Sequence, residues 1–156
     1  MDTPAPRNPA VPPLLVRRAD PAGERDVVAL LRDVPVDPEE VVDLMRHHGV
    51  LVLSDLSLPP TVPPLAAAAF RLDRAAGIAQ LAGIGVRAQL RGQGLGRRLL
   101  IGALTWLRAD GFEQVHVFAA RGPAAPSLLA SAGFVVERGA APADPADGCS
   151  RLVLVL

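Results

Sequence analysis

The sequence of 156 residues contains no lysine, no tyrosine and a single cysteine, Cys149. All 16 basic residues are therefore arginines, which excludes chemistry that needs a lysine, such as a Schiff base or a P-loop. One cysteine cannot form an intrachain disulfide, and this favours a reducing compartment, so we expect a cytoplasmic protein. Nothing near Cys149 resembles a base that would activate a thiol, and we expect it to be unreactive.

Charge and hydropathy exclude further classes of partner. The 16 acidic residues balance the 16 basic ones, so the chain lacks the electrostatic footprint of a nucleic-acid-binding or basic membrane-surface protein. Its apolar stretches are far shorter than the roughly 18 residues of a membrane span, and its first residues lack a signal pattern. No cluster has the spacing of a metal site. We therefore expect no nucleic-acid partner, no membrane partner and no metal.

Proline is concentrated at the start of the chain. Residues 1–13 include five prolines, which remove backbone donors and resist regular structure, so this segment is predicted to be a disordered arm. Residues 14–156 have the size of one ordinary domain, and 50% of the chain is hydrophobic, enough for a sizeable core. We therefore expect a single domain after the arm.

Helices and strands alternate along this domain. Two Asp-Pro pairs, at 20–21 and 37–38, are typical of helix starts, and glycines follow the predicted helix ends. The predicted helices are 21–32, 38–48, 95–109 and 126–132. The predicted strands are 14–18, 50–54, 65–72, 78–86, 114–119, 134–137 and 151–156. This order indicates the α/β (α+β) class.

The most informative stretch is GIGVRAQLRGQGLGRRLL, at 83–100, where an apolar strand runs into a glycine-rich loop that opens a helix. Such an arrangement binds anions, because glycines let the backbone approach a ligand and the free N–H groups at a helix start point toward it. Arg91, Arg97 and Arg98 add positive charge. The segment is therefore predicted to bind phosphate.

Two other families with glycine-rich loops do not fit. A dinucleotide-binding fold would begin its helix at GIGVRA and carry an acidic residue at the end of the next strand. That strand ends with Phe118-Ala119-Ala120-Arg121, which contains no acid. A P-loop requires a lysine, and the chain has none.

Residues 91–96, RGQGLG, match the [Q/R]-x-x-G-x-[G/A] pyrophosphate-binding motif of the GCN5-related N-acetyltransferase (GNAT) family, and the chain resembles this family from Leu14 to Leu156. The preceding Ile-Gly-Val, the helix end at 109–112 and the Ser-Ala-Gly-Phe at 131–134 strengthen the resemblance. It implies a mixed, mostly antiparallel sheet flanked by helices, with acetyl-CoA as co-substrate.

The resemblance also implies how acetyl-CoA is held. The backbone of 84–86 would bond the pantetheine arm as an extra strand, in a splay between the two central strands, and the loop 91–96 would hold the pyrophosphate. The backbone N–H of Val86 would polarise the thioester carbonyl. The expected cofactor-binding residues are Ile84, Gly85, Val86, Arg91, Gly92, Gln93, Gly94, Leu95, Gly96 and Arg97.

Two residues that many relatives use in catalysis are missing. Counting back from Gly133-Phe134, Leu129 occupies the position of the tyrosine that protonates the leaving thiolate, and Gly122 that of an asparagine before the helix. A thiol has a pKa of about 8.5, so its thiolate is already a fair leaving group at neutral pH. We therefore expect acetyl transfer without a tyrosine acid, at a reduced rate.

The general base must come from an unusual place, because the strand position where relatives often carry a glutamate holds Gln80. His48 continues the apolar face of the helix 38–48 by its i, i+7 spacing from Val41. This helix borders the acceptor site in the family, and a histidine titrates in the useful range. His48 is therefore the candidate base, with a packed or exposed histidine as the alternative.

The other titratable residues are expected to be structural. His116 alternates with apolar residues on a predicted central strand and is expected to be a hydrogen-bonded core histidine. His47 lies one turn after Asp43 and is expected to form a surface pair with it. Glu39 and Glu40 begin a helix, where the helix dipole favours carboxylates, and recognition of an acceptor amine is the alternative.

Together these patterns predict an N-acetyltransferase that passes the acetyl group of acetyl-CoA directly to a small amine. Two alternatives stay open. A longer acyl-CoA or carrier-bound donor would find room beside the small residues at 66–69, Ala79, Ala82 and Gly83, and a non-catalytic CoA-binding or regulatory module would explain the missing catalytic residues. Formation of a homodimer is a further possibility that the sequence leaves undecided.

Overall fold

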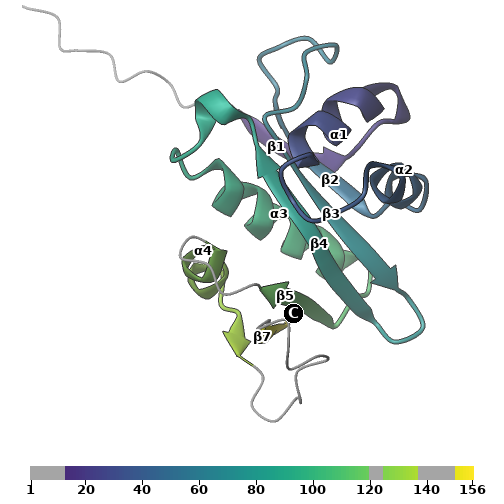
Figure 1. Cartoon of the computed structure of the whole chain (residues 1–156), viewed down its shortest axis with the longest axis vertical. Helices are drawn as coiled ribbons and strands as arrows, with labels where there is room; N and C mark the ends of the chain where they lie inside the picture. Colours follow the sequence, from purple (N-terminus) through teal and green to yellow (C-terminus); the bar gives the residue numbers. More distant parts are fainter. Residues whose placement is uncertain (1–12, 120–124, 137–149) are drawn as a thin grey trace, which may run out of the picture.

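A computed structural model describes residues 13–119, 125–136 and 150–156 (Figure 1). Within these residues seven strands form one sheet in the order β1-β2-β3-β4-β5-β7-β6, and helices cover both faces. Only β4 and β5 are parallel, and every other pair of neighbours is antiparallel. The predicted single domain with a mixed, mostly antiparallel sheet is confirmed. The predicted arm lies outside the described residues, except for Pro13.

The order of elements is the one predicted, and their ends agree to within two residues, except that the first three residues of the helix predicted at 21–32 form a 3-10 helix. The strands are β1 (Leu14–Arg18), β2 (Val50–Asp55), β3 (Ala66–Asp73), β4 (Ile78–Val86), β5 (Gln114–Ala119), β6 (Val135–Val136) and β7 (Ser150–Val155). The α-helices are α1 (Glu24–Leu31), α2 (Pro38–Arg46), α3 (Leu95–Ala109) and α4 (Ala125–Ser131), and short 3-10 helices span Pro21–Gly23 and Ala88–Leu90.

The end of α2 differs from the prediction. The helix stops at Arg46, and His48 adopts the left-handed conformation, with a φ of 61°, and is exposed. The cause is a Schellman cap, in which the N–H of His48 donates to the carbonyl oxygen of Met45 at 3.1 Å and the N–H of Gly49 donates to that of Leu44 at 2.7 Å. Only glycine fits after this turn, since a Cβ on Gly49 would lie 2.3 Å from the carbonyl oxygen of Phe70. His48 does not continue the apolar face.

Two hydrophobic clusters hold the layers together. On one face of the sheet, α1 and α2 pack their apolar sides on β2 and β3, with Val27, Leu31 and Val41 each 1% exposed. On the other face α3 packs through Leu99 and Leu100, both fully buried. Burial of each leucine stabilises the fold by about 1.5–3 kcal/mol. These contacts fix α1 and α3 on opposite sides of β4.

Candidate functional site

The sheet opens between β4 and β5. Their parallel pairing runs from Ile78 with Gln114 to Leu81 with Val117 and then stops. Beyond that point β4 continues for five residues to Val86, and β5 pairs only with β7. Within the described residues, the open side of β4 therefore has no strand partner over residues 82–86.

The backbone groups that point into this gap follow from the pairing of β4 with β3. The N–H of Arg87 donates to the carbonyl oxygen of Leu65, at 3.0 Å, on the β3 side. Because peptide groups alternate along a strand, Gly85 also faces β3, and Ile84 and Val86 face the gap. An extended ligand could therefore pair with Ile84 and Val86, and Gly85 could not offer its N–H.

A β-bulge at Ala82 interrupts β4 beside the gap. Ala69 of β3 pairs with Gly83, whereas the next residue, Phe70, pairs with Leu81, which leaves Ala82 as the extra residue. A bulge of this kind bends the strand and moves the following side chains to the opposite face. The bulge lies at the level where the pairing of β4 with β5 stops.

The bulge explains the glycines that follow it. Ile84 and Val86 pack on the α3 side, so Gly83 and Gly85 face the opposite side, which α1 and the loop after it cover. A Cβ on Gly85 would lie 2.0 Å from the carbonyl oxygen of Leu30 in α1. The absence of a side chain at Gly85 therefore allows α1 to pack closely on β4, which is a structural role distinct from ligand binding.

The glycine-rich loop leads directly into the start of α3. Gly92 and Gly94 have positive φ values of 78° and 77°, a conformation that favours glycine. Gly94 is the N-cap, and its carbonyl accepts the first helical hydrogen bond from Arg98. No side chain of the described segments caps the helix, and no acidic residue lies in its first turn. The first N–H groups of α3 are therefore available to an anion.

The arginines around this loop differ in their contacts. Arg91 donates from Nε to the carbonyl oxygen of Val86 and from Nη2 to Asp33, both at 3.2 Å. Arg97 and Arg98 are exposed in the first turn of α3. Gly96 lies against the end of β4, since a Cβ there would be 3.5 Å from Val86. The gap, the loop and the cations therefore lie next to one another.

The structure does not bring the candidate base to the gap. His48 lies just before β2, and β3 separates β2 from β4, which corresponds to a distance of about 10 Å between the strands. Leu129, at the expected tyrosine position, is 3% exposed and belongs to the core cluster on the α3 face. Gly122 and Cys149 lie outside the described residues.

His116 is buried and hydrogen-bonded, as predicted for a core histidine. Its Nδ1 lies 3.2 Å from Nη2 of Arg151 and its Nε2 lies 2.9 Å from Oε1 of Gln114. A guanidinium can only donate, so Nδ1 accepts and Nε2 carries the proton. The basic nitrogen of His116 is thus engaged in a hydrogen bond with Arg151. Gln80 lies beside it in the register of β4 and β5.

Glu40, one of the two glutamates at the start of α2, contacts the sheet. Glu40 forms a two-point ion pair with Arg71 of β3. The hydrogen bond from Arg71 lowers the pKa of the Glu40 carboxyl, and the same bond raises the pKa of Arg71. The ion pair of Glu40 with Arg71 therefore ties α2 to the sheet.

The predicted surface pair of His47 with Asp43 is confirmed, with 3.6 Å between Nε2 of His47 and Oδ1 of Asp43.

Sequence reasoning missed the bulge, the pairing of Arg91 with Asp33, and a polar hollow of about 460 Å³ between α1 and residues 86–91. The bulge left no clear sequence signal, because the large apolar residues of β4 are Ile78, Leu81, Ile84 and Val86, and their numbers show no single change from odd to even.

Two searches of the described residues concern other kinds of site. None of the helices in these segments combines the length and apolarity that crossing a membrane requires. No group of three or more histidine, cysteine, aspartate or glutamate side chains in the same segments could hold a metal ion.

Comparisons with known proteins agree with this geometry. A search of curated proteins gives no match. The solved structure of the GNAT family N-acetyltransferase YhbS from Escherichia coli, in complex with CoA, is 24% identical, with a TM-score of 0.70, over 95% of this chain and 83% of that chain. The IAA acetyltransferase from Bacillus cereus is 15% identical, with a TM-score of 0.68, over 92% and 100% of the two chains.

A chain of the NatC complex bound to Gag peptide and CoA is 13% identical, with a TM-score of 0.72, over 92% of this chain and 98% of that chain. At such identities these likenesses establish the fold alone. The model of the acetyltransferase (GNAT) family matches residues 39–134, which is more than half of the sequence. The chain therefore belongs to the acetyltransferase (GNAT) family.

Proposed function

We propose that this protein is an N-acetyltransferase that transfers the acetyl group of acetyl-CoA directly to a small amine. The proposal rests on one observation: the gap between β4 and β5 lies next to the start of α3, where no described side chain caps the first N–H groups. An extended pantetheine arm would pair with Ile84 and Val86, and a pyrophosphate would meet the N–H groups after Gly94. Arg91, Arg97 and Arg98 supply the positive charge that a diphosphate requires.

The reaction needs few groups from the protein. The neutral amine nitrogen attacks the thioester carbon, and the backbone N–H of Val86 donates to the oxygen that becomes negative. Collapse of this intermediate breaks the C–S bond and releases the CoA thiolate, and the amine proton passes to solvent. Neither Leu129 nor His116 can take part in proton transfer, the first because it is apolar and the second because its basic nitrogen is engaged.

The acceptor site is proposed in the polar hollow beside Val86. The hollow has a volume of about 460 Å³, a size typical of small-molecule sites, and its charged lining is Asp26 of α1, Asp33, Arg32, Arg87 and Arg91. Asp33 is paired with Arg91 and Arg32, so Asp26 is the carboxylate that we propose to attract the ammonium group. Location in the cytoplasm and a homodimer remain predictions from the sequence.

Release of free thiol from acetyl-CoA in the presence of a panel of small amines tests the proposal. We expect thiol release that depends on the amine, together with a product heavier than the amine by one acetyl group. CoA binding without transfer to any amine would favour the regulatory module. Faster transfer from a longer acyl-CoA than from acetyl-CoA would favour the second donor class.

The matched variant pair for the acceptor site is Asp26→Asn and Asp43→Asn. Asp26 lines the hollow, and Asp43 lies on the exposed side of α2. We expect Asp26→Asn to raise KM for the amine about threefold or more and to leave KM for acetyl-CoA unchanged. Asp43→Asn should change neither constant. Equal effects of the two substitutions would place the acceptor elsewhere.

A further inference from the structure

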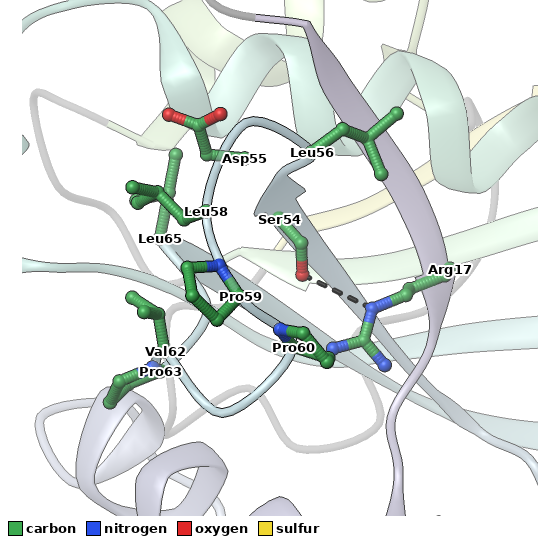
Figure 2. Close-up of a pocket in the computed structure, with 10 residues that line it drawn as sticks. All are labelled: Arg17, Ser54, Asp55, Leu56, Leu58, Pro59, Pro60, Val62, Pro63 and Leu65. Atoms are coloured by element: carbon green, nitrogen blue, oxygen red, sulfur yellow. Dashed lines mark hydrogen bonds between the residues drawn. The ribbon is translucent and has the colours of Figure 1, made fainter.

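A second hollow lies away from the gap, where the ends of β1 and β2 meet the segment 56–65 (Figure 2). Its volume is about 230 Å³. Leu58, Pro59, Pro60, Val62 and Leu65 form an apolar wall, and Arg17 and Ser54 form a polar end. The hollow is separated from the gap by β3. It therefore lies outside the proposed acetyl-CoA site, and the only lining residue that it shares with the proposed acceptor hollow is Pro63.

The polar end of this hollow holds a cation that has no carboxylate partner in the described part of the chain. Arg17 is half-buried, and its Nε donates to the hydroxyl oxygen of Ser54 at 3.2 Å. Among the residues that the structure describes, Arg18, Arg71, Arg74 and Arg91 form ion pairs with acids on other elements, and Arg17 forms none. Figure 2 shows Nε turned toward Ser54 and the terminal nitrogens beside Pro60.

The bond to Ser54 sets the direction of the guanidinium. A guanidinium carries its donors in a rigid plane, so holding Nε fixes where the two terminal amino groups point. Such a fork matches the two oxygens of a carboxylate. A half-buried cation with free donors next to an apolar wall is the arrangement that an amphiphilic anion would satisfy.

Charge and size narrow the class of ligand. Asp55 also lines the hollow, and its carboxylate would repel a doubly charged anion such as phosphate more strongly than a singly charged one. The volume lies below the range of about 300–1,000 Å³ that is typical of drug-sized ligands. We infer that this hollow binds a small monocarboxylate with a short apolar tail, whose carboxylate pairs with Arg17 and whose tail packs on the proline-rich wall.

The inference does not depend on the proposed function, because it uses no residue of the gap or of the glycine-rich loop. Titration of the full-length ¹⁵N-labelled protein with 4-methylpentanoate, followed by amide chemical shifts, tests it. We expect saturable shifts at Ser54, Asp55 and Leu65 with a Kd of roughly 1 mM or tighter. The amine of the same shape, 4-methylpentylamine, and inorganic phosphate should not produce them.

Variants assign the binding to Arg17. Arg17→Gln keeps the length of the stem but removes the charge, and it should weaken binding of 4-methylpentanoate at least tenfold. Arg17→Lys keeps the charge but lacks the planar pair of terminal amino groups, and it should weaken binding less than Arg17→Gln does. Arg46→Gln removes an exposed arginine of α2 outside the hollow and should bind as the wild type does.

Several results would overturn the inference. One is an absence of saturable shifts up to about 50 mM ligand, well above the expected Kd. Others are equal binding of the amine, shifts confined to residues 91–96, and unchanged affinity of a folded Arg17→Gln variant. The amide spectrum and the melting temperature of each variant show whether it is folded.

Discussion

A Cβ atom on Gly85 would lie 2.0 Å from the carbonyl oxygen of Leu30, so α1 and β4 meet at a point where only glycine fits. The obstacle is backbone, which cannot rotate away as a side chain can. Gly85→Ala should therefore displace α1 and lower the free energy of unfolding by about 1–3 kcal/mol or more. Urea unfolding measures the loss. Gly23→Ala, with no atom within 4 Å of its Cβ, is the control and should be nearly neutral.

The glycine-rich loop offers a second matched pair. Gly94 and Gly111 both have positive φ, 77° and 91°, and open space around a Cβ. Valine at either position should cost about 1–2 kcal/mol or more of stability, because the left-handed conformation is unfavourable for it. Only Gly94→Val should abolish acetyl-CoA binding in calorimetry. Unchanged affinity in a folded Gly94→Val protein would show that the pyrophosphate does not bind there.

Backbone groups that face the gap should be distinguishable by hydrogen exchange. The N–H of Gly85 faces β3, whereas those of Ile84 and Val86 face the gap. We expect the amides of Ile84 and Val86 to exchange faster than that of Gly85 in the free protein, and saturating CoA to slow them at least tenfold. Slow exchange at all three positions in the free protein would mean that the gap is already closed.

The rate of acetyl transfer should follow the protonation of the acceptor. An alkylamine has a pKa of about 10.4, and the described residues place no free basic side chain at the gap, so kcat/KM should rise about tenfold per pH unit between pH 6 and 9. His48→Asn should leave this profile unchanged, and asparagine tolerates the positive φ of 61°. A plateau near pH 7 that disappears in His48→Asn would restore the histidine as the base.

The ion pair of Glu40 with Arg71 should make the free energy of unfolding depend on pH in the acid range. Arg71 lowers the pKa of the Glu40 carboxyl from its ordinary value of 4.5. The pair therefore stabilises the native state fully at a pH above 4.5, and this contribution is lost as the pH falls through the lowered pKa of Glu40. Both side chains are partly exposed, at 31% and 42%, so Glu40→Gln should cost only about 0.5–1 kcal/mol at pH 7.

Urea unfolding from pH 7 down to pH 3 measures this difference. Wild type and Glu40→Gln should converge in stability at the acid end, because the wild-type carboxyl is then protonated as well. Glu39→Gln is the control, since Glu39 begins the same helix without a cross-element ion pair among the described residues. A difference that persists undiminished to pH 3 would show that Glu40 contributes by packing.

Local signals in the sequence were sufficient for most of the fold. Gly94 and Gly111 mark the two ends of α3, and the predicted bounds of this helix are the observed ones. The mostly apolar run at 114–119 predicted β5. His48 was misplaced because periodicity counts side chains along one helix and cannot show that backbone hydrogen bonds cap α2 before His48. The pairing of Arg91 with Asp33 joins residues 58 positions apart, and no local pattern predicts such a contact.

An unpaired strand edge at the rim of a sheet is a template for strands of other molecules, and proteins usually protect such edges with charges or a covering segment. The open edge of β4 lies in the interior of the sheet, beside β5 and next to the first turn of α3. A strand that belongs to another folded sheet cannot enter there. The position of the opening thus protects against intermolecular β-pairing and admits only a narrow chain that carries no sheet of its own.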